Sequence, residues 1–382
     1  HKPYATDMAS ASNQLDLSVD VVELTCALVD FPSQSRSEAA LADAVERALS
    51  SYSHLEVLRD GNTVLARTNL GRGERVVIAG HLDTVPSSGN DRAILISQGG
   101  SVPVPDVDGK KIASEDRLYG LGSCDMKGGL AVALLLAANE SSPSRDVTYI
   151  FYDCEEIEER FNGLKRISEN HPEWLQSDFA VLMEPSNAVV EGGCQGTMRV
   201  EIRVTGRRAH TARSWMGLNA IHELAPILHT LENYEPAKVI IDGLEYREGL
   251  QAVDIYGGVA GNVVPDSACI TINYRFAPNK SAEDALNHLQ QVFVGYQVEV
   301  VDYAEGALPG LSRPAAQQFI QSVVGKPQAK FGWTDVARFS SLGIPAVNFG
   351  PGFAALAHAP NEYVPIAQLH STLNAMQNWL AS

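Results

Sequence analysis

Two patterns of apolar and polar positions alternate along the chain. In the first half, short apolar runs typical of buried strands occur at 64–67, 76–79, 148–152 and 179–183. Helical patterns occur at 19–28, 37–49 and 129–138. Strand runs that are apolar on both faces and alternate with helices predict a mainly parallel sheet flanked by helices. The C-terminal part repeats this texture, with helices expected at 315–324 and 367–380 and a strand at 346–349.

The middle of the chain has a different pattern. Residues 200–205 and 268–276 alternate apolar and polar residues, as half-buried strands do. Between them, apolar residues at helical spacing from Leu218 to Leu231 predict an amphipathic helix, which Pro226 should kink or start later. A helix at 282–292 and a strand at 297–301 complete a strand–helix–strand–helix–strand unit of the α+β class.

These patterns predict an α/β fold in which one domain is inserted into another. Residues 15–195 and 307–382 are expected to form the larger, discontinuous domain, and residues 196–306 the smaller α+β domain. Residues 1–14 read as a polar N-terminal tail without the apolar segment of a signal peptide, and Met8 is a candidate natural start. The apolar run at 130–138 is much shorter than the roughly 20 residues that cross a bilayer.

Composition narrows the function classes. The net charge of −17 argues against nucleic acid and against an anionic membrane surface as partners, because both attract basic faces. The five cysteines are scattered and form no C-x-x-C pair, which favours a reducing compartment and a cytoplasmic location over a disulfide framework.

Acidic and histidine residues follow the predicted strands. His81 and Asp83 follow the strand at 76–79, Glu155 and Glu156 follow the strand at 148–152, and Glu184 follows the strand at 179–183. Sites in open parallel sheets form at the carboxyl ends of the strands, so we expect these residues to converge there.

The residue types suit a divalent metal such as zinc. In an extended segment His81 and Asp83 point the same way, so the Asp83 carboxylate can accept a proton from the far ring nitrogen of His81. Glu155 and Glu156 would face opposite ways, one binding metal and one addressing water. Asp125, in a loop before the helix at 129–138, could bridge two metals or could cap that helix.

Five motifs together resemble one family, the zinc-dependent amidohydrolases that include aminoacylase, glutamate carboxypeptidase, acetylornithine deacetylase and succinyl-diaminopimelate desuccinylase. The motifs are Gly80-His81-Leu82-Asp83-Thr84-Val85-Pro86, Gly122 to Gly129, Asp153 to Glu156, Glu184-Pro185, and His358-Ala359-Pro360-Asn361-Glu362. The resemblance covers the chain from about 21 to 380 and implies the family's zinc-peptidase-like catalytic domain.

The resemblance also implies roles for single residues. Asp125 would bridge two zinc ions, His81 and Glu184 would hold one, and Glu156 and His358 would hold the other. One or two zinc ions per subunit are expected, and cobalt or manganese could substitute because the same ligands suit each. Glu155 would be the general acid/base, with Asp83 beside His81. The family further implies a cis peptide after Asp125.

The inserted domain carries a segment, 207–213, that is similar to the family's lid. The resemblance implies that His210 reaches the active site of a partner subunit and stabilises the oxyanion, so that the protein is a homodimer through this domain. Asn262 is similar to a lid asparagine near the substrate.

Segments at 193–196, 208–215, 273–279 and 330–339 look closest to the succinyl-diaminopimelate desuccinylases of the actinobacterial type. The implied reaction is hydrolysis of N-succinyl-LL-2,6-diaminopimelate in lysine and diaminopimelate biosynthesis. Its substrate carries three carboxylates, which guanidinium groups bind with paired hydrogen bonds. The candidate substrate-binding residues are Arg275, Asn262, Arg213, Thr334 and Arg338.

Other interpretations stay open at this point. Acetylornithine deacetylation, or hydrolysis of another N-acyl amino acid, would use the same metal chemistry. A metal-stabilised scaffold without turnover would not need Glu155 beside a ligand. A thiolate nucleophile at Cys124 or Cys154 is disfavoured because neighbouring carboxylates raise a thiol's pKa. The sequence contains no G-x-S-x-G, dinucleotide-binding or P-loop motif.

Overall fold

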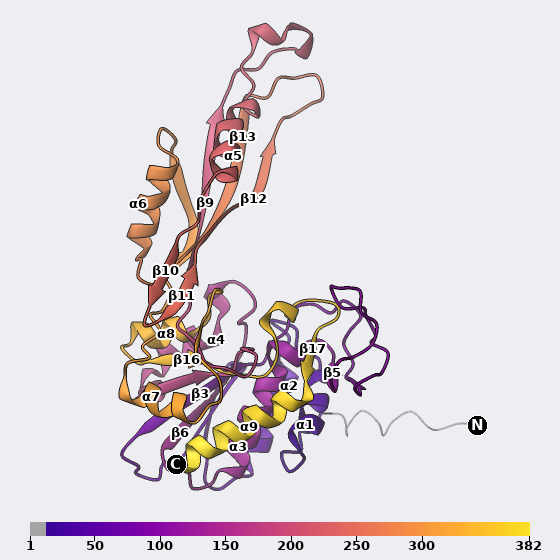
Figure 1. Cartoon of the computed structure of the whole chain (residues 1–382), viewed down its shortest axis with the longest axis vertical. Coiled ribbons are helices and arrows are strands. Elements are labelled where there is room, and N and C mark those ends of the chain that lie inside the picture. Colours follow the sequence, from indigo (N-terminus) through magenta and orange to yellow (C-terminus); the bar gives the residue numbers. More distant parts are fainter. Residues whose placement is uncertain (1–12) are drawn as a thin grey trace, which may run out of the picture. The chain divides into compact units, whose positions relative to one another are not determined.

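The computed structural model of the chain describes residues 13–382 (Figure 1). The expected tail falls almost wholly outside the described residues, as does Met8. Contacts divide the chain into two compact units. Among the described residues, unit 1 comprises 13–191, Gly310–Pro327 and Arg338–Ser382, and unit 2 comprises Gly192–Pro309 and Gln328–Ala337. The segment 328–337, which the predicted boundaries assigned to the larger domain, thus groups with unit 2.

Unit 1 is built on strands of a mixed sheet in the order β1-β2-β6-β3-β7-β16. The strands are β1 (Glu56–Asp60), β2 (Thr63–Arg67), β3 (Arg75–His81), β6 (Asp146–Tyr152), β7 (Phe179–Leu182) and β16 (Ala346–Asn348). β6, β3, β7 and β16 are parallel, and the hairpin β1–β2 joins antiparallel to β6. The predicted mainly parallel α/β sheet is therefore confirmed.

The central strands have no solvated face. Every residue of β6 and β7 is buried, as is every residue of β3 after Arg75, because helices cover both sides of such a sheet. The helices of unit 1 are α1 (Val21–Val29), α2 (Ala39–Ser50), α3 (Gly128–Asn139), α4 (Gly163–Asn170), α7 (Pro314–Gln321) and α9 (Ile366–Ala381). α1, α3 and α9 pack against one another (Figure 1).

Helix α3 brings its N-terminus very close to the sheet. A Cβ atom at Gly129 would lie 2.0 Å from the carbonyl oxygen of Met183, directly after β7, so only glycine allows this approach. The helix is buried as far as Ala138, which explains why its sequence shows no polar face. This contact places the turn before α3 beside the carboxyl end of β7.

Residues 87–119, for which the sequence predicted no strands, contribute to a small antiparallel sheet. Its order is β17 (Tyr363–Pro365), β5 (Arg117–Tyr119) and β4 (Ile94–Ile96). β17 follows the motif at 358–362, so this sheet helps to fix the C-terminal motif within unit 1.

Unit 2 is an antiparallel sheet covered by two helices. The strand order is β12 (Gly249–Gly257), β13 (Ser267–Phe276), β9 (Gly196–Thr205) and β14 (Val298–Ala304), and the helices are α5 (Ala225–Glu232) and α6 (Ala282–Val292). Its core includes Ile202, Leu224, Ile227, Ile270 and Leu289. A hairpin of β10 (Lys238–Ile241) and β11 (Leu244–Arg247) and the short β15 (Gln328–Ala329) complete the unit. The unit boundaries fall inside β8 (Glu191–Gly192) and α8 (Val336–Ser341).

Two expectations for this region are wrong. The long amphipathic helix does not form: Leu218, Ile221 and Leu228 are exposed, and α5 begins only at Ala225. Pro226 occupies the first turn of α5, where its missing N–H costs nothing, so the alternative that Pro226 shifts the start of the helix is confirmed and the predicted kink is not. The strand order also omitted β10, β11 and β12. β12 is exposed from Gln251 onward, which explains why its sequence lacks an alternating pattern.

In the described part of the chain, no helix combines the length and the apolar character needed to cross a membrane.

Candidate metal centre

Three neighbouring parallel strands of unit 1 end at one edge of the sheet. His81, the last residue of β3, pairs with Tyr152 at the end of β6, and Ala79 pairs with Leu182 at the end of β7. The chain then continues from each strand into the polar residues that the sequence analysis singled out. Parallel register therefore delivers these segments to the same edge, as expected.

At this edge, five of the predicted residues form two groups of three. His81, Asp125 and Glu184 each offer a ligand atom within 4.8 Å of the others, and so do Asp125, Glu156 and His358. Asp125 belongs to both groups and presents a different oxygen to each: Oδ1 lies 3.1 Å from His81 Nε2, and Oδ2 lies 3.3 Å from His358 Nε2. A carboxylate shared in this way suits a pair of divalent ions.

The remaining distances are consistent with the same grouping. Glu184 Oε1 lies 3.7 Å from His81 Nε2, and Glu156 lies 3.1 Å from His358 Nε2. His358 is the most exposed of the five, with half of its side chain accessible, whereas His81 is fully buried. The cluster thus opens to solvent on the side of His358.

Asp125 is held by the turn that carries it. The turn, Ser123–Lys127, precedes α3, and the Asp125–Met126 peptide is cis, which confirms that expectation. The buried Glu362 carboxylate accepts hydrogen bonds from the N–H groups of Gly122 at 2.8 Å and of Asp125 at 3.0 Å. The buried Lys127 ammonium donates to the carbonyls of Leu28 and Phe31. The turn is therefore fixed from both sides.

The Asp83 carboxylate lies beside His81 Nδ1, as predicted, and it has a further role. Its oxygens accept the N–H groups of Glu155 at 3.0 Å and Glu156 at 3.1 Å, and the hydroxyl of Ser35 at 2.7 Å. The closest oxygen to His81 Nδ1 is the backbone carbonyl of Asp83, at 2.9 Å, while the nearer carboxylate oxygen lies at 3.4 Å. Asp83 therefore orients His81 mainly through its backbone and fixes the Glu155–Glu156 segment with its side chain.

The prediction that Glu155 and Glu156 face opposite ways is wrong. Both offer carboxylate oxygens that group with His81 within 4.8 Å, and Glu155 Oε2 lies 3.9 Å from His81 Nε2. The segment is not extended, because Cys154 has a φ of 56° and turns the chain directly after β6. Both carboxylates consequently reach the same side, next to the ligand groups.

Charge in the cluster favours cations. Burial opposes a charge on His81, yet Glu184, Asp125 and Asp83 raise its pKa well above the usual value. Asp125 and Glu156 raise the pKa of His358 to about 10. Burial would raise the pKa of Asp125, but His358 and His81 keep it below its ordinary range. The cluster contains four carboxylates but only two imidazoles that can carry a compensating positive charge. Two divalent ions fit this excess of negative charge.

Unit 2 places the other predicted residues at two separate ends. His210 and Asn262 are neighbours, because the N–H of Thr211 donates to the carbonyl of Asn262 and His210 pairs with Val263. Exposed Arg213 belongs to the same loop. Arg275 lies near the far end of β13 and donates to Asn273, and the buried Thr334 contacts Cys194 through its carbonyl.

Arg338, in unit 1, donates to the Glu159 carboxylate at 3.2 Å. Its predicted contact with a substrate stays a prediction, as do the roles predicted for the residues of unit 2 and for the metal ligands.

The sequence analysis included Glu362 and Lys127 in motifs without assigning either a role, and it did not name Ser35. The only feature of the sequence that pointed to a role for Glu362 was its place in the same motif as His358. Ser35 and Lys127 act through contacts that no local pattern encodes.

Comparisons with known proteins agree with this geometry. Residues 77–382 match the sequence profile of Peptidase family M20/M25/M40. The chain is 43% identical to succinyl-diaminopimelate desuccinylase of Corynebacterium glutamicum, over 96% of this chain and 98% of that protein. It is 51% identical, over 96% of this chain and 99% of the other, to a Mycobacterium tuberculosis protein provisionally named as the same enzyme.

Solved structures share the fold. A tripeptidase of Staphylococcus aureus superposes with a TM-score of 0.71 at 19% identity, covering 96% of this chain and 98% of that one. A Bacillus subtilis protein described as a dinuclear metal-binding peptidase superposes with a TM-score of 0.63 at 18% identity, covering 94% and 96%. Together with the profile match over most of the sequence, these findings establish that the chain belongs to peptidase family M20/M25/M40.

Proposed function

We propose that this protein hydrolyses the amide bond of N-succinyl-LL-2,6-diaminopimelate, giving succinate and LL-2,6-diaminopimelate for diaminopimelate and lysine biosynthesis. The observation that carries the proposal is the pair of ligand groups sharing Asp125, in a chain that covers almost the whole length of a desuccinylase from Corynebacterium glutamicum. A structural metal site would not need two ligand groups beside a further carboxylate.

Zinc is the proposed metal, with one or two ions per subunit and cobalt as a possible substitute. His81 and Glu184 would hold one ion, Glu156 and His358 the other, and Asp125 both. The imidazole and carboxylate donors suit zinc, and the three carboxylates contribute −3 against +4 for two ions. When bound, such ions lower the pKa of water and polarise an acyl carbonyl.

Glu155 supplies the proton transfers. Its carboxylate accepts the proton of the attacking water and later donates it to the leaving amine nitrogen. The N–H of Glu155 is fixed by Asp83, and its side chain lies beside His81, so the base is already positioned near the ligands. Asp83 supports the reaction by holding this segment in place.

Recognition of the substrate is assigned to residues outside the ligand cluster. We propose that Arg275, Arg213 and Arg338 bind substrate carboxylates, because guanidinium groups bind carboxylates with two hydrogen bonds. Asn262 and Thr334 would contribute neutral hydrogen bonds. His210 would donate to the oxyanion of a partner subunit's site, which its exposed loop supports.

This assignment requires a homodimer formed through unit 2. The exposed edge strand β12 supports it, since Val253, Ile255 and Tyr256 on this strand are all about half exposed. An edge strand with apolar side chains is a surface on which a second copy can add. A cytoplasmic location is part of the proposal and is supported by five cysteines that are free in the structure.

The proposal is tested by amide hydrolysis with metal-stripped protein, with and without zinc, on N-succinyl-LL-diaminopimelate and N-acetylornithine in parallel. Zinc-dependent turnover of the succinyl substrate alone is expected. Turnover of acetylornithine instead would keep the metal chemistry and change the substrate. Zinc binding without turnover of either substrate would overturn the proposed activity and favour a scaffold.

A further inference from the structure

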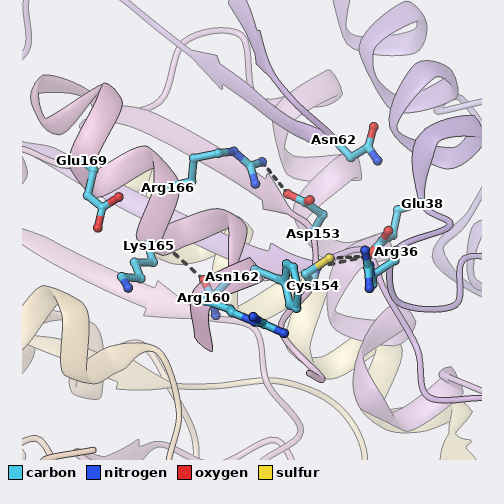
Figure 2. A pocket seen from close by; sticks show the side chains of 11 residues that line it. Arg36, Glu38, Asn62, Asp153, Cys154, Arg160, Asn162, Lys165, Arg166 and Glu169 are labelled. Carbon is cyan, nitrogen blue, oxygen red and sulfur yellow. Dashed lines mark hydrogen bonds and ion pairs between the residues drawn. The ribbon is translucent and has the colours of Figure 1, made fainter. Parts of the chain in front are cut away.

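A cavity separate from the ligand cluster borders the segment that carries Glu155 and Glu156. Its volume is about 340 Å³, and Asp153 and Cys154 form part of its lining, whereas none of the proposed metal ligands does. Figure 2 shows Arg36, Arg160 and Lys165 among the side chains arranged around these two residues. The cavity lies entirely within unit 1.

Within residues 13–382, the four cationic side chains that line the cavity outnumber its three carboxylates. Arg166 is engaged, because it donates to Asp60 at 2.8 Å and to Asp153 at 2.7 Å. Among residues 13–382, by contrast, no carboxylate lies within ion-pair distance of Arg36, Arg160 or Lys165. Three unpaired cations around one cavity are notable in a chain with a net charge of −17.

The carboxylates in the lining leave this charge in place. Asp153 pairs with Arg166, as described, and the buried Glu38 uses Oε1 to accept the N–H of Cys154 at 3.0 Å. Glu169, the third, is exposed to solvent. None of the three contacts Arg36, Arg160 or Lys165 at ion-pair distance.

The two free guanidinium groups are held by an aromatic ring. The guanidinium carbon of Arg36 lies 4.7 Å from the centre of the Phe161 ring, and that of Arg160 lies 4.6 Å from it. Contact with the ring restricts both side chains while leaving their N–H donors available. The side chains of Asn62 and Asn162 add polar groups to the lining.

We propose that this cavity binds a small polyvalent oxyanion, one that carries two or more carboxylate or phosphate oxygens spread over its surface. Guanidinium groups recognise carboxylate and phosphate through the same paired hydrogen bonds, and an ammonium adds a point charge. The volume is at the lower end of the range for small-molecule sites, which suits a compact metabolite.

Such a ligand would act on the metal centre through the shared segment. Asp153 and Cys154 line the cavity, and Glu155 and Glu156 follow them directly. The anion is therefore a regulator that changes turnover without contacting the substrate. This effect on turnover rests on the proposed function, whereas binding of the anion does not.

Calorimetric titration of the zinc-loaded protein with inorganic phosphate and, separately, with glutarate tests the proposal. We expect saturable binding of at least one, weakened at least tenfold in Arg160→Gln/Lys165→Gln and, independently, in Arg36→Gln. Arg92→Gln/Lys111→Gln removes two exposed charges elsewhere and should bind like the wild type. Binding of phosphate alone would identify a phosphorylated ligand, and binding of glutarate alone a polycarboxylate.

Two results would overturn the site: no saturable binding of either anion, or equal affinity in the wild type and in both cavity variants. Zinc content and circular dichroism, measured on every variant, separate loss of the cavity from loss of the metal or of the fold. Because binding is measured without turnover, failure of the desuccinylase assignment leaves this test intact.

Discussion

The ligand cluster of unit 1 and the predicted substrate residues of unit 2 are organised in opposite ways. In unit 1, residues from five distant places in the chain form two groups of three that share Asp125, and the ligand atoms of each group lie within 4.8 Å of one another. Backbone N–H groups of the segments that carry Asp125 and Glu155 donate to buried carboxylates, which anchors these segments. In unit 2, His210 and Asn262 lie next to the start of β13, while Arg275 lies near its end. At about 3.3 Å per residue, Ser267 and Arg275 are roughly 26 Å apart along that strand.

The difference has a consequence for mechanism. The proposed metal ligands all lie within one unit of one chain. In unit 2, by contrast, a single copy cannot bring both groups of predicted residues to one small substrate. His210 and Arg275 can serve the same substrate only if one of them comes from another copy. The separation therefore supports the proposal that His210 acts in a partner subunit.

The largest expected effect comes from removing the shared ligand. Asp125→Ala should abolish binding of both metal ions and lower turnover by roughly three orders of magnitude or more, because metal-ion stabilisation supplies several kcal/mol. Elemental analysis of the purified variant measures the metal. Glu184→Ala is the matched control and should lose only one ion. Retention of both ions by Asp125→Ala would contradict the shared-ligand arrangement.

Removing the proposed base should separate turnover from metal binding. Glu155→Gln is expected to reduce turnover by roughly 10² to 10⁴, the usual contribution of a positioned acid/base group. Its metal content should match the wild type, since the five proposed ligands are intact. If metal were lost together with activity, Glu155 would be a ligand, which its position 3.9 Å from His81 Nε2 also allows.

Mixing two weakly active variants tests directly whether His210 acts in the site of a partner subunit. Glu155→Gln and His210→Ala homodimers should each be weakly active. After subunits are exchanged at equal amounts, half the dimers are mixed, and each mixed dimer contains one site with both an intact base and an intact partner histidine. Activity should recover to roughly one quarter of the wild-type value. No recovery despite verified exchange would place His210 in its own subunit's site or outside the mechanism.

Smaller losses are expected from the residues that position the ligands. Asp83→Asn keeps the shape of the side chain but weakens the hydrogen bonds from the N–H groups of Glu155 and Glu156. Glu362→Gln places an NH₂ group against one of the two backbone N–H donors, of Gly122 and Asp125, that Glu362 accepts. Each should reduce metal affinity by about 10- to 100-fold. Competition with a chromogenic chelator measures the affinity. Wild-type affinity in both variants would show that the backbone alone fixes the cluster.

The contrast also explains what the sequence could predict. Short apolar runs in the sequence reveal the parallel strands. Because these strands end at one edge of the sheet, the convergence of His81, Glu156 and Glu184 could be predicted from them. The common orientation of Glu155 and Glu156 depends on a single left-handed residue, Cys154, and cysteine gives no signal for that conformation.

In unit 2 the local signals were weaker. Apolar residues at helical spacing also occur where they stay exposed, as Leu218 and Ile221 do, so periodicity alone overestimated the helix. The edge strand β12 is exposed on both faces and therefore lacks the alternation that marks a half-buried strand. The residues predicted by resemblance alone, such as Arg275 and Thr334, came without any pattern that places them relative to each other.

The smallest expected effect concerns stability, and it separates the fold of unit 1 from its chemistry. The Asp146 carboxylate accepts hydrogen bonds from the Thr68 hydroxyl at 2.7 Å and from the N–H groups of Leu70 and Arg72 at 2.8 Å. Burial alone would raise the pKa of Asp146, but these donors keep it below the usual value. Since the folded pKa is depressed, this stabilisation is fully present above the unfolded value near 4 and is lost as the pH falls through the folded pKa.

Asp146→Asn should therefore lower the free energy of unfolding by about 2 kcal/mol at pH 7, the scale of hydrogen bonds to a charged group. The difference in unfolding free energy between the variant and the wild type should shrink as the pH is lowered below about 4. The wild-type carboxyl then becomes protonated and neutral, like the amide that replaces it. Urea unfolding at a series of pH values measures both quantities. Metal content and turnover at pH 7 should stay near wild type, since Asp146 begins β6 at the end opposite to the ligands. A constant difference at all pH values would mean that the variant disturbs packing rather than a charged hydrogen-bond network.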